Sequence, residues 1–167
     1  MNRFFTPIKL LIASCSLCAS ALSFAASCDA PEHRGFDFWL GDWRVQTPAG
    51  KLAGMNRIAS IQGGCALREQ YMTGKGYSGE SLSIYDSVRK VWHQTWVDTS
   101  GMLLMLEGGL RDGKMILEGT TTKADGGLTQ HRVTWTPVSD GSVRQHWETK
   151  VAQEDWKTAF DGNYTRQ

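Results

Sequence analysis

Hydrophobic and polar residues alternate along most of the chain from residue 42 onward. In 89–98, Trp92, Gln94 and Trp96 occupy one face of an extended chain, and His93 lies on the other. Because successive side chains of a strand point to opposite faces, this period of two predicts β-strands. The predicted strands cover about 42–48, 51–61, 65–74, 78–86, 89–98, 102–110, 113–122, 127–137, 142–151 and 156–166.

Short breaks rich in Gly separate these segments, such as Pro48-Ala49-Gly50, Asp112-Gly113 and Asp140-Gly141. Gly and Asp accept the backbone conformations of tight turns, and connections this short join antiparallel neighbours. A meander of about ten strands must protect its edges, and closure into a barrel does so most completely. We therefore predict an all-β fold, a single antiparallel meander barrel. The alternative is a two-sheet sandwich of the same strands.

The same alternation predicts which side chains face the interior. The inward set combines large aromatic rings with a few polar groups. An aromatic wall with convergent polar groups is typical of a small-molecule pocket. The alternative is a filled barrel whose polar members hydrogen-bond to one another. The predicted ligand-binding residues are Glu69, Tyr71, Trp92, Gln94, Trp96, His131, Trp135 and Trp147.

One segment before the strands has a helical pattern. A helix is predicted from Pro31 to Leu40, because Pro suits a helix start and Phe36, Trp39 and Leu40 then share one face. The later run 102–106 is apolar without interruption, which is typical of a strand covered on both sides. We expect the N-terminal helix to cover its outer face. The alternative is an exposed patch that pairs two copies.

Residues 1–27 have the pattern of a secretory signal peptide. Arg3 and Lys9 precede an apolar stretch from Leu10 to Phe24, and small residues follow. We predict an exported protein, periplasmic or secreted, whose folded domain covers 28–167. An N-terminal membrane anchor is one alternative. A lipoprotein modified at Cys28 is another, because Ala25-Ala26-Ser27-Cys28 resembles a lipobox without its usual Leu.

Removal of the signal leaves two cysteines, Cys28 and Cys65. In an oxidising compartment one disulfide between them is the simplest outcome. Lipidation of Cys28 would instead leave Cys65 free.

The net charge after removal of the signal is close to zero. The 18 Lys and Arg less Arg3 and Lys9 leave 16, against 17 Asp and Glu, a net charge of −1. No stretch has the basic density that phosphate binding needs, so we expect no nucleic-acid partner.

A set of short motifs spans nearly the whole of 28–167. Gly41-x-Trp43 is the G-x-W that opens the first strand of lipocalins and their calycin relatives. The set as a whole resembles a family of small exported bacterial proteins, the domain of unknown function numbered 1579. The other motifs are Gly63-Gly64-Cys65-Ala66-Leu67-x-Glu69, Gly79-x-Ser81-Leu82, Trp92-His93-Gln94-x-Trp96-Val97-Asp98 and Phe160-Asp161-Gly162-x-Tyr164-x-Arg166.

The resemblance implies a lipocalin-like barrel and little about activity, because fold does not fix function. In calycins a basic residue from the last strand lies over the Trp of the G-x-W motif. The resemblance therefore implies structural roles for Gly41, Trp43 and Arg166: Trp43 closes one end of the barrel and Arg166 covers it.

The remaining candidate functions are ligand binding and a haem or enzymatic site. We expect an exported protein that binds a small, largely apolar molecule, without a stable membrane span, as a monomer or weak homodimer. The alternative is a haem or acid/base enzymatic site centred on His131. The related nitrobindin barrels hold haem through one His, but here Arg44-Val45-Gln46 replaces the glycines that follow their G-x-W. No catalytic motif is present, so we expect no cofactor, no metal site and no catalytic residue.

Overall fold

The computed structural model describes residues 28–167, and the predicted signal peptide lies outside the described residues. Between residues 28 and 167 the chain forms ten strands, which end within two residues of their predicted bounds. The strands are β1 (Gly41–Gln46), β2 (Leu52–Ile61), β3 (Ala66–Met72), β4 (Ser78–Asp86), β5 (Val91–Asp98), β6 (Leu103–Arg111), β7 (Lys114–Thr122), β8 (Leu128–Pro137), β9 (Val143–Val151) and β10 (Lys157–Arg166).

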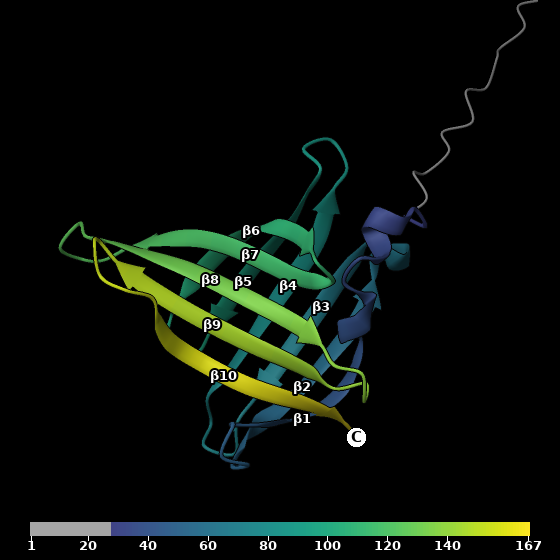
Figure 1. The fold of residues 1–167 in the computed structure, drawn as a ribbon, viewed down its shortest axis with the longest axis horizontal. Helices are drawn as coiled ribbons and strands as arrows, with labels where there is room; N and C mark the ends of the chain where they lie inside the picture. The colour runs from purple at the N-terminus through teal and green to yellow at the C-terminus, as the bar shows by residue number, and fades with distance from the viewer. Residues whose placement is uncertain (1–27) are drawn as a thin grey trace, which may run out of the picture.

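The strands close into a barrel, which confirms the predicted fold class and excludes the two-sheet sandwich. Each strand pairs with its neighbour in sequence, and β1 pairs with β10 to complete the circle. The closing ladder aligns Trp43 with Arg166 and Gln46 with Asn163. Figure 1 shows β6–β10 on the near side of the barrel, with β2–β5 crossing behind them.

The predicted N-terminal helix is not a single helix. It consists of two short 3-10 turns, η1 (Pro31–Arg34) and η2 (Asp37–Trp39), because Phe36 between them has a non-helical backbone with φ −112° and ψ 7°. This break directs both Phe36 and Trp39 into the end of the barrel, where they stack with ring centroids 4.9 Å apart. Phe36 also contacts Trp92 and Trp135. We call Phe36, Trp39, Trp92 and Trp135 the base layer.

The expectation that this N-terminal segment covers the strand at 102–106 is wrong. Leu103 and Met105 point outward from β6 and are 55% and 56% exposed, whereas Leu104 and Leu106 point inward and are buried. The apolar rings of the N-terminal segment pack inside the barrel end instead, so they do not lie on the outer face of β6.

The predicted disulfide is confirmed. Cys28 is bonded to Cys65, which follows the short turn η3 (Gln62–Gly64) between β2 and β3. Arg34 strengthens the same attachment, because its Nη1 donates a hydrogen bond to the Gly64 carbonyl oxygen at 3.1 Å. The bond uses the Cys28 sulfur that lipidation would need. The disulfide therefore attaches the start of the described chain to the barrel wall beside the base layer.

Trp43 and Arg166 meet at the seam between the first and last strands. Trp43 is fully buried, and its Nε1 donates to the Trp39 carbonyl oxygen at 2.9 Å. The Arg166 guanidinium lies over the indole, 4.5 Å from the ring centroid, and donates to the Leu40 carbonyl oxygen at 3.0 Å. Gly41 permits this approach: it has φ +139°, and a Cβ there would lie 2.5 Å from Arg166 Nη1.

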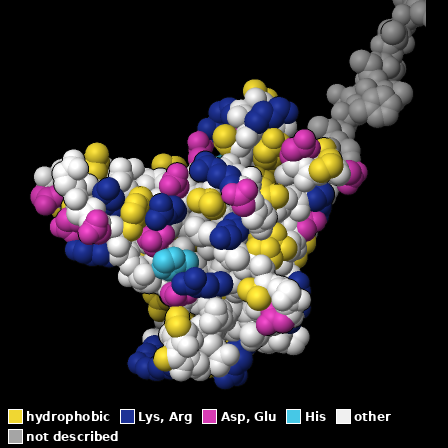
Figure 2. Space-filling model, viewed as in Figure 1, with side chains coloured by type: hydrophobic (Ala, Val, Ile, Leu, Met, Phe, Trp, Pro, Cys, Tyr) yellow, Lys and Arg dark blue, Asp and Glu magenta, His cyan; other side chains and the backbone are white. Residues whose placement is uncertain are grey.

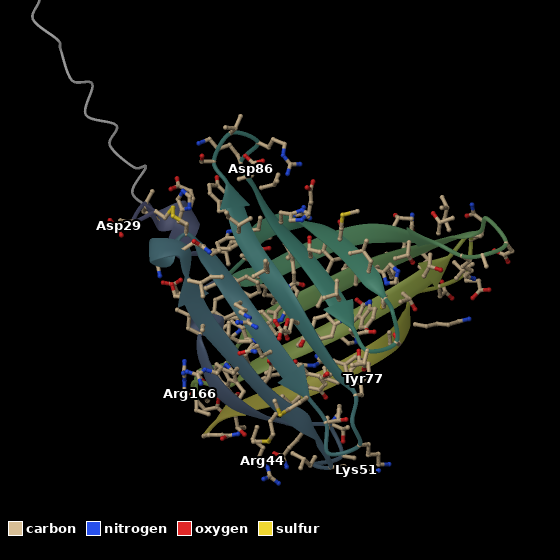
Figure 3. The ribbon with its side chains drawn as sticks, turned by 180° about the vertical axis from the view of Figure 1, so that it is seen from behind. Asp29, Arg44, Lys51, Tyr77, Asp86 and Arg166 are labelled. Atoms are coloured by element: carbon tan, nitrogen blue, oxygen red, sulfur yellow. A yellow bond between two sulfur atoms is a disulfide. The ribbon has the colours of Figure 1, made fainter. Side chains whose placement is uncertain are left out.

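Arg166→Ala is expected to lower the free energy of unfolding by about 1 kcal/mol, because it removes a solvent-accessible cation–π contact and one hydrogen bond. Urea denaturation measures this loss. Arg44→Ala is the control, since Arg44 is exposed on β1, the strand that pairs with the strand of Arg166 (Figure 3). This variant should lose no more than about 0.5 kcal/mol of stability. Equal losses in the two variants would contradict the structural role of Arg166.

The outer face of β8–β10 carries charged side chains of both signs, which Figure 2 shows interspersed. Cross-strand ion pairs connect them: Arg132 with Glu148 at 3.0 Å, and Arg144 with Asp161 at 2.7 Å. None of the helical segments within residues 28–167 has the length and apolar character to cross a membrane.

Candidate functional site

The barrel interior has two different halves. The base layer fills the end that receives the N-terminal segment, with Trp39 and Trp135 fully buried. The other half contains a cavity of about 270 Å³, just below the usual range of about 300–1,000 Å³ for ligand sites. It is lined by Glu69, Tyr71, Thr73, Tyr77, Gln94, Trp96, Leu104, Leu106, Val133, Gln145, Trp147, Ala159, Phe160 and Tyr164.

The cavity reaches the surface at the end of the barrel opposite the base layer. Tyr77, from the β3–β4 turn, and Ala159, from the start of β10, are both exposed lining residues. Figure 3 shows Tyr77 and Lys51 at this end, away from Asp29 and Asp86. Tyr164 separates the two halves: it contacts Trp39 and Trp43 on one side and lines the cavity on the other. The interior is therefore closed at one end and hollow at the other.

Glu69 is the buried carboxyl group of this cavity. Its position on β3 faces inward, and its cross-strand partner on β4 is Ser81. Glu69 Oε2 accepts a hydrogen bond from Ser81 Oγ at 2.7 Å, and Oε1 accepts one from Asn56 Nδ2 at 2.7 Å. Burial raises the pKa of Glu69 to about 7, although the two hydrogen bonds act in the opposite direction. The group therefore changes charge near neutral pH.

Most polar groups of the surrounding aromatic side chains are bonded to the protein. Tyr71 donates to the Ala53 carbonyl oxygen at 2.9 Å, and Tyr164 donates to Gln145 Oε1. Near the mouth, Tyr77 and Trp96 both donate to Asp98 Oδ2, at 2.9 Å and 3.1 Å. With these polar atoms engaged, the rings present mainly carbon surface to the cavity.

A small residue creates the space for one of these rings. Gly79 on β4 is aligned near Trp96 of β5, and a Cβ at residue 79 would lie 2.2 Å from the indole Cζ2. Any other residue at this position would displace the indole from its place in the wall. The motif Gly79-x-Ser81-Leu82 does not reveal this packing role, because the role depends on the fold.

The structure divides the sequence-predicted site residues into two groups. Glu69, Tyr71, Gln94, Trp96 and Trp147 line the cavity together. The other three members of the predicted set, Trp92, His131 and Trp135, are buried but do not line it. Trp92 and Trp135 belong to the base layer and pack against Phe36.

His131 lies behind the cavity wall with both ring nitrogens occupied. Its Nδ1 accepts a hydrogen bond from Trp147 Nε1 at 3.2 Å, so the proton resides on Nε2, which lies 2.8 Å from Thr121 Oγ1. Burial lowers the pKa of His131, which keeps the ring neutral. His131 is not among the residues that line the cavity, and both of its ring nitrogens have hydrogen-bond partners, so this arrangement offers no free nitrogen for an axial haem ligand. It also does not pair His131 with Glu69 for acid/base chemistry.

Several lining residues were absent from the sequence-predicted set. Gln145 shares a face with Trp147, and Leu104 and Leu106 alternate within the apolar run 102–106, so alternation contained this information. Phe160 could not be found in this way, because the pairing of β10 with β9 shifts register between Thr158 and Phe160. The other lining residues outside the predicted set are Thr73, Tyr77, Val133, Ala159 and Tyr164.

The side chains of residues 28–167 include no cluster of three or more His, Cys, Asp or Glu placed to hold a metal ion. Comparison with models of known protein families finds no match to the sequence. Comparison with curated proteins likewise finds no match.

Proposed function

We propose that this protein binds a compact, largely apolar small molecule in the open half of its barrel. One observation carries the proposal: a cavity of about 270 Å³ has a mostly aromatic and aliphatic wall and a buried polar group, Glu69, at its side. This combination is characteristic of small-molecule sites, where apolar surface supplies affinity and a few polar groups supply orientation. The cavity size favours a single ring with a short chain over a sterol.

The proposal includes export and family membership. The secretory pattern of residues 1–27 and the Cys28–Cys65 disulfide both support an oxidising compartment, periplasmic or extracellular. The closed meander and the contact of Arg166 with Trp43 support a lipocalin-like barrel of the kind implied by the resemblance to the domain of unknown function numbered 1579.

A pair of neighbouring leucines provides the test. Leu104→Trp adds an indole to the cavity wall, whereas Leu103→Trp makes the same change on the outer face of β6. Isothermal titration calorimetry with a panel of compact aromatic probes (2-phenylethanol, indole and 2-phenylethylamine) should show one site in the wild-type protein. Leu104→Trp should weaken binding at least about tenfold by filling the cavity, and Leu103→Trp should leave it unchanged.

Thermal melting of both variants checks that they remain folded. Ala159→Trp offers a second obstruction, at the exposed mouth, where overpacking of the core is not involved. Failure of every probe to bind the wild-type protein would overturn the proposal. Unchanged binding in both Leu104→Trp and Ala159→Trp would overturn it as well.

A further inference from the structure

The polar part of the cavity has an unbalanced charge. Within residues 28–167, the lining contains one carboxyl group, that of Glu69, and no Lys, Arg or His side chain. The next acidic group, Asp98, lies near the mouth and accepts hydrogen bonds from Tyr77 and Trp96. A buried carboxylate without a cationic partner is costly, and a bound cation would offset that cost.

Hydrogen-bond acceptors are also in excess beside Glu69. A carboxylate offers about four acceptor positions, and Glu69 uses one on each oxygen, for Asn56 and Ser81. Asn56 donates through Nδ2, and its Oδ1 is buried without a partner among the described residues. The groups around Glu69 therefore need donors rather than further acceptors.

The aromatic wall suits the same kind of ligand. The faces of aromatic rings attract cations, and this attraction grows when water is excluded. Six aromatic side chains surround the cavity, and Tyr71 lies within 6.5 Å, centroid to centroid, of both Tyr77 and Phe160. The full aromatic set is Tyr71, Tyr77, Trp96, Trp147, Phe160 and Tyr164.

We propose that the ligand of this cavity is an organic amine, whose ammonium group binds the Glu69 carboxylate while its apolar body contacts the aromatic wall. This inference rests on the proposed function and specifies its ligand class. An ammonium supplies up to three donors, and Glu69, which lines the cavity, has acceptor positions left for them beyond its bonds to Asn56 and Ser81. A carboxylic acid such as a fatty acid would bring a second negative charge against Glu69, so the site discriminates against it.

Three probes of similar shape separate these alternatives: 2-phenylethylamine, 2-phenylethanol and 3-phenylpropionate. At pH 8, calorimetric titration of the full folded protein should give an affinity for the amine about tenfold above that for the alcohol, because a charge-assisted hydrogen bond replaces a neutral one. The propionate should bind more weakly than the alcohol. In Glu69→Gln the amine should lose about tenfold in affinity, while the alcohol should change less than about threefold.

Glu118→Gln is the matched control, because Glu118 is exposed on the outer face of β7 and should leave all three affinities unchanged. Melting curves confirm that both variants are folded. The wild-type ratio of amine to alcohol affinity does not depend on either variant, so the inference stays testable even when a variant is unstable.

The pH dependence of binding gives a second readout. Glu69 is bonded to Asn56 on β2 and Ser81 on β4, and it interacts electrostatically with Tyr71, Tyr77 and Tyr164. All three tyrosines have raised pKa values and stay neutral. With the Glu69 pKa at about 7, lowering the pH from 8 to 6 should weaken amine binding roughly tenfold, because most Glu69 is then protonated. Alcohol binding should stay constant, and Glu69→Gln should abolish the pH effect.

The outcomes separate the two proposals. If the alcohol binds but the amine shows no preference, or if Glu69→Gln retains the preference, the amine inference is overturned and the proposed function stands. Tighter binding of the propionate would also overturn it. If none of the three probes binds, both proposals fall.

Discussion

Glu69→Gln is expected to gain about 3 kcal/mol of stability relative to the wild-type protein when the pH is raised from 4.5 to 8. Burial raises the folded-state pKa of Glu69 to about 7, whereas the unfolded chain has the ordinary value of 4.5. Between these values the folded state keeps a proton that the unfolded state has released. Stability therefore falls as the pH rises from about 4.5 to 7 and stays at the lower level above.

Glutamine preserves the local geometry while removing this dependence. Its side-chain oxygen can accept from Asn56 Nδ2, and its amide nitrogen can donate to Ser81 Oγ, so both hydrogen bonds of Glu69 are replaced. The contribution of Glu69 is obtained as the difference between variant and wild type at each pH, since all other titrating groups are common to both. Urea denaturation at pH 4.5, 6, 7 and 8 measures it, with Glu118→Gln as the control. A stability difference that is independent of pH would contradict the burial of Glu69 as a charged group.

Trp39→Ala is expected to lower the free energy of unfolding by about 3–5 kcal/mol, which is the cost of truncating a large buried aromatic side chain. Trp39 is fully buried and lies at the centre of the base layer, stacked on Phe36 and 5.3 Å from the Trp135 ring centroid. Its removal would leave a hollow that the rigid strands around it cannot collapse to fill. Urea denaturation at a fixed pH provides the measurement.

Two further variants make this prediction specific. Trp39→Phe keeps a ring and removes an indole N–H that is buried without a partner among the described residues, so its loss should be less than half that of Trp39→Ala. Val88→Ala, at an 88% exposed position in the β4–β5 turn, should change stability by less than about 0.5 kcal/mol. A Trp39→Ala loss no larger than that of Val88→Ala would show that the base layer does not support the barrel.

The sequence contains enough information for the barrel because strand alternation and short turns are local properties. The period of two places Trp92 and Trp96 on one face of β5, and both are indeed inside. Alternation does not specify height along the barrel axis. Four residues of a strand span about 13 Å, so Trp92 reaches the base layer while Trp96 lines the cavity.

The base layer itself could not be predicted from helical spacing. That spacing groups Phe36 with Trp39 correctly, but the direction in which they point depends on the break at Phe36 and on the open barrel end beside it. The environment of Glu69 is also a tertiary property. Its neighbours Asn56 and Ser81 come from two other strands, and their contacts depend on strand register. His131 appeared equivalent to Glu69 by alternation alone, yet its bonds to Trp147 and Thr121 place it behind the wall.

The Cys28–Cys65 bond makes a covalent ring that contains the three 3-10 turns η1, η2 and η3 and the first two strands. A protease that cuts the backbone once inside this ring leaves both fragments attached to each other. The cut piece stays at high local concentration beside its partner strands, so it can return to its place without diffusing away. Nicked molecules of the oxidised protein thus remain single covalent species, whereas the same nick in the reduced chain leaves two pieces that only non-covalent contacts hold together.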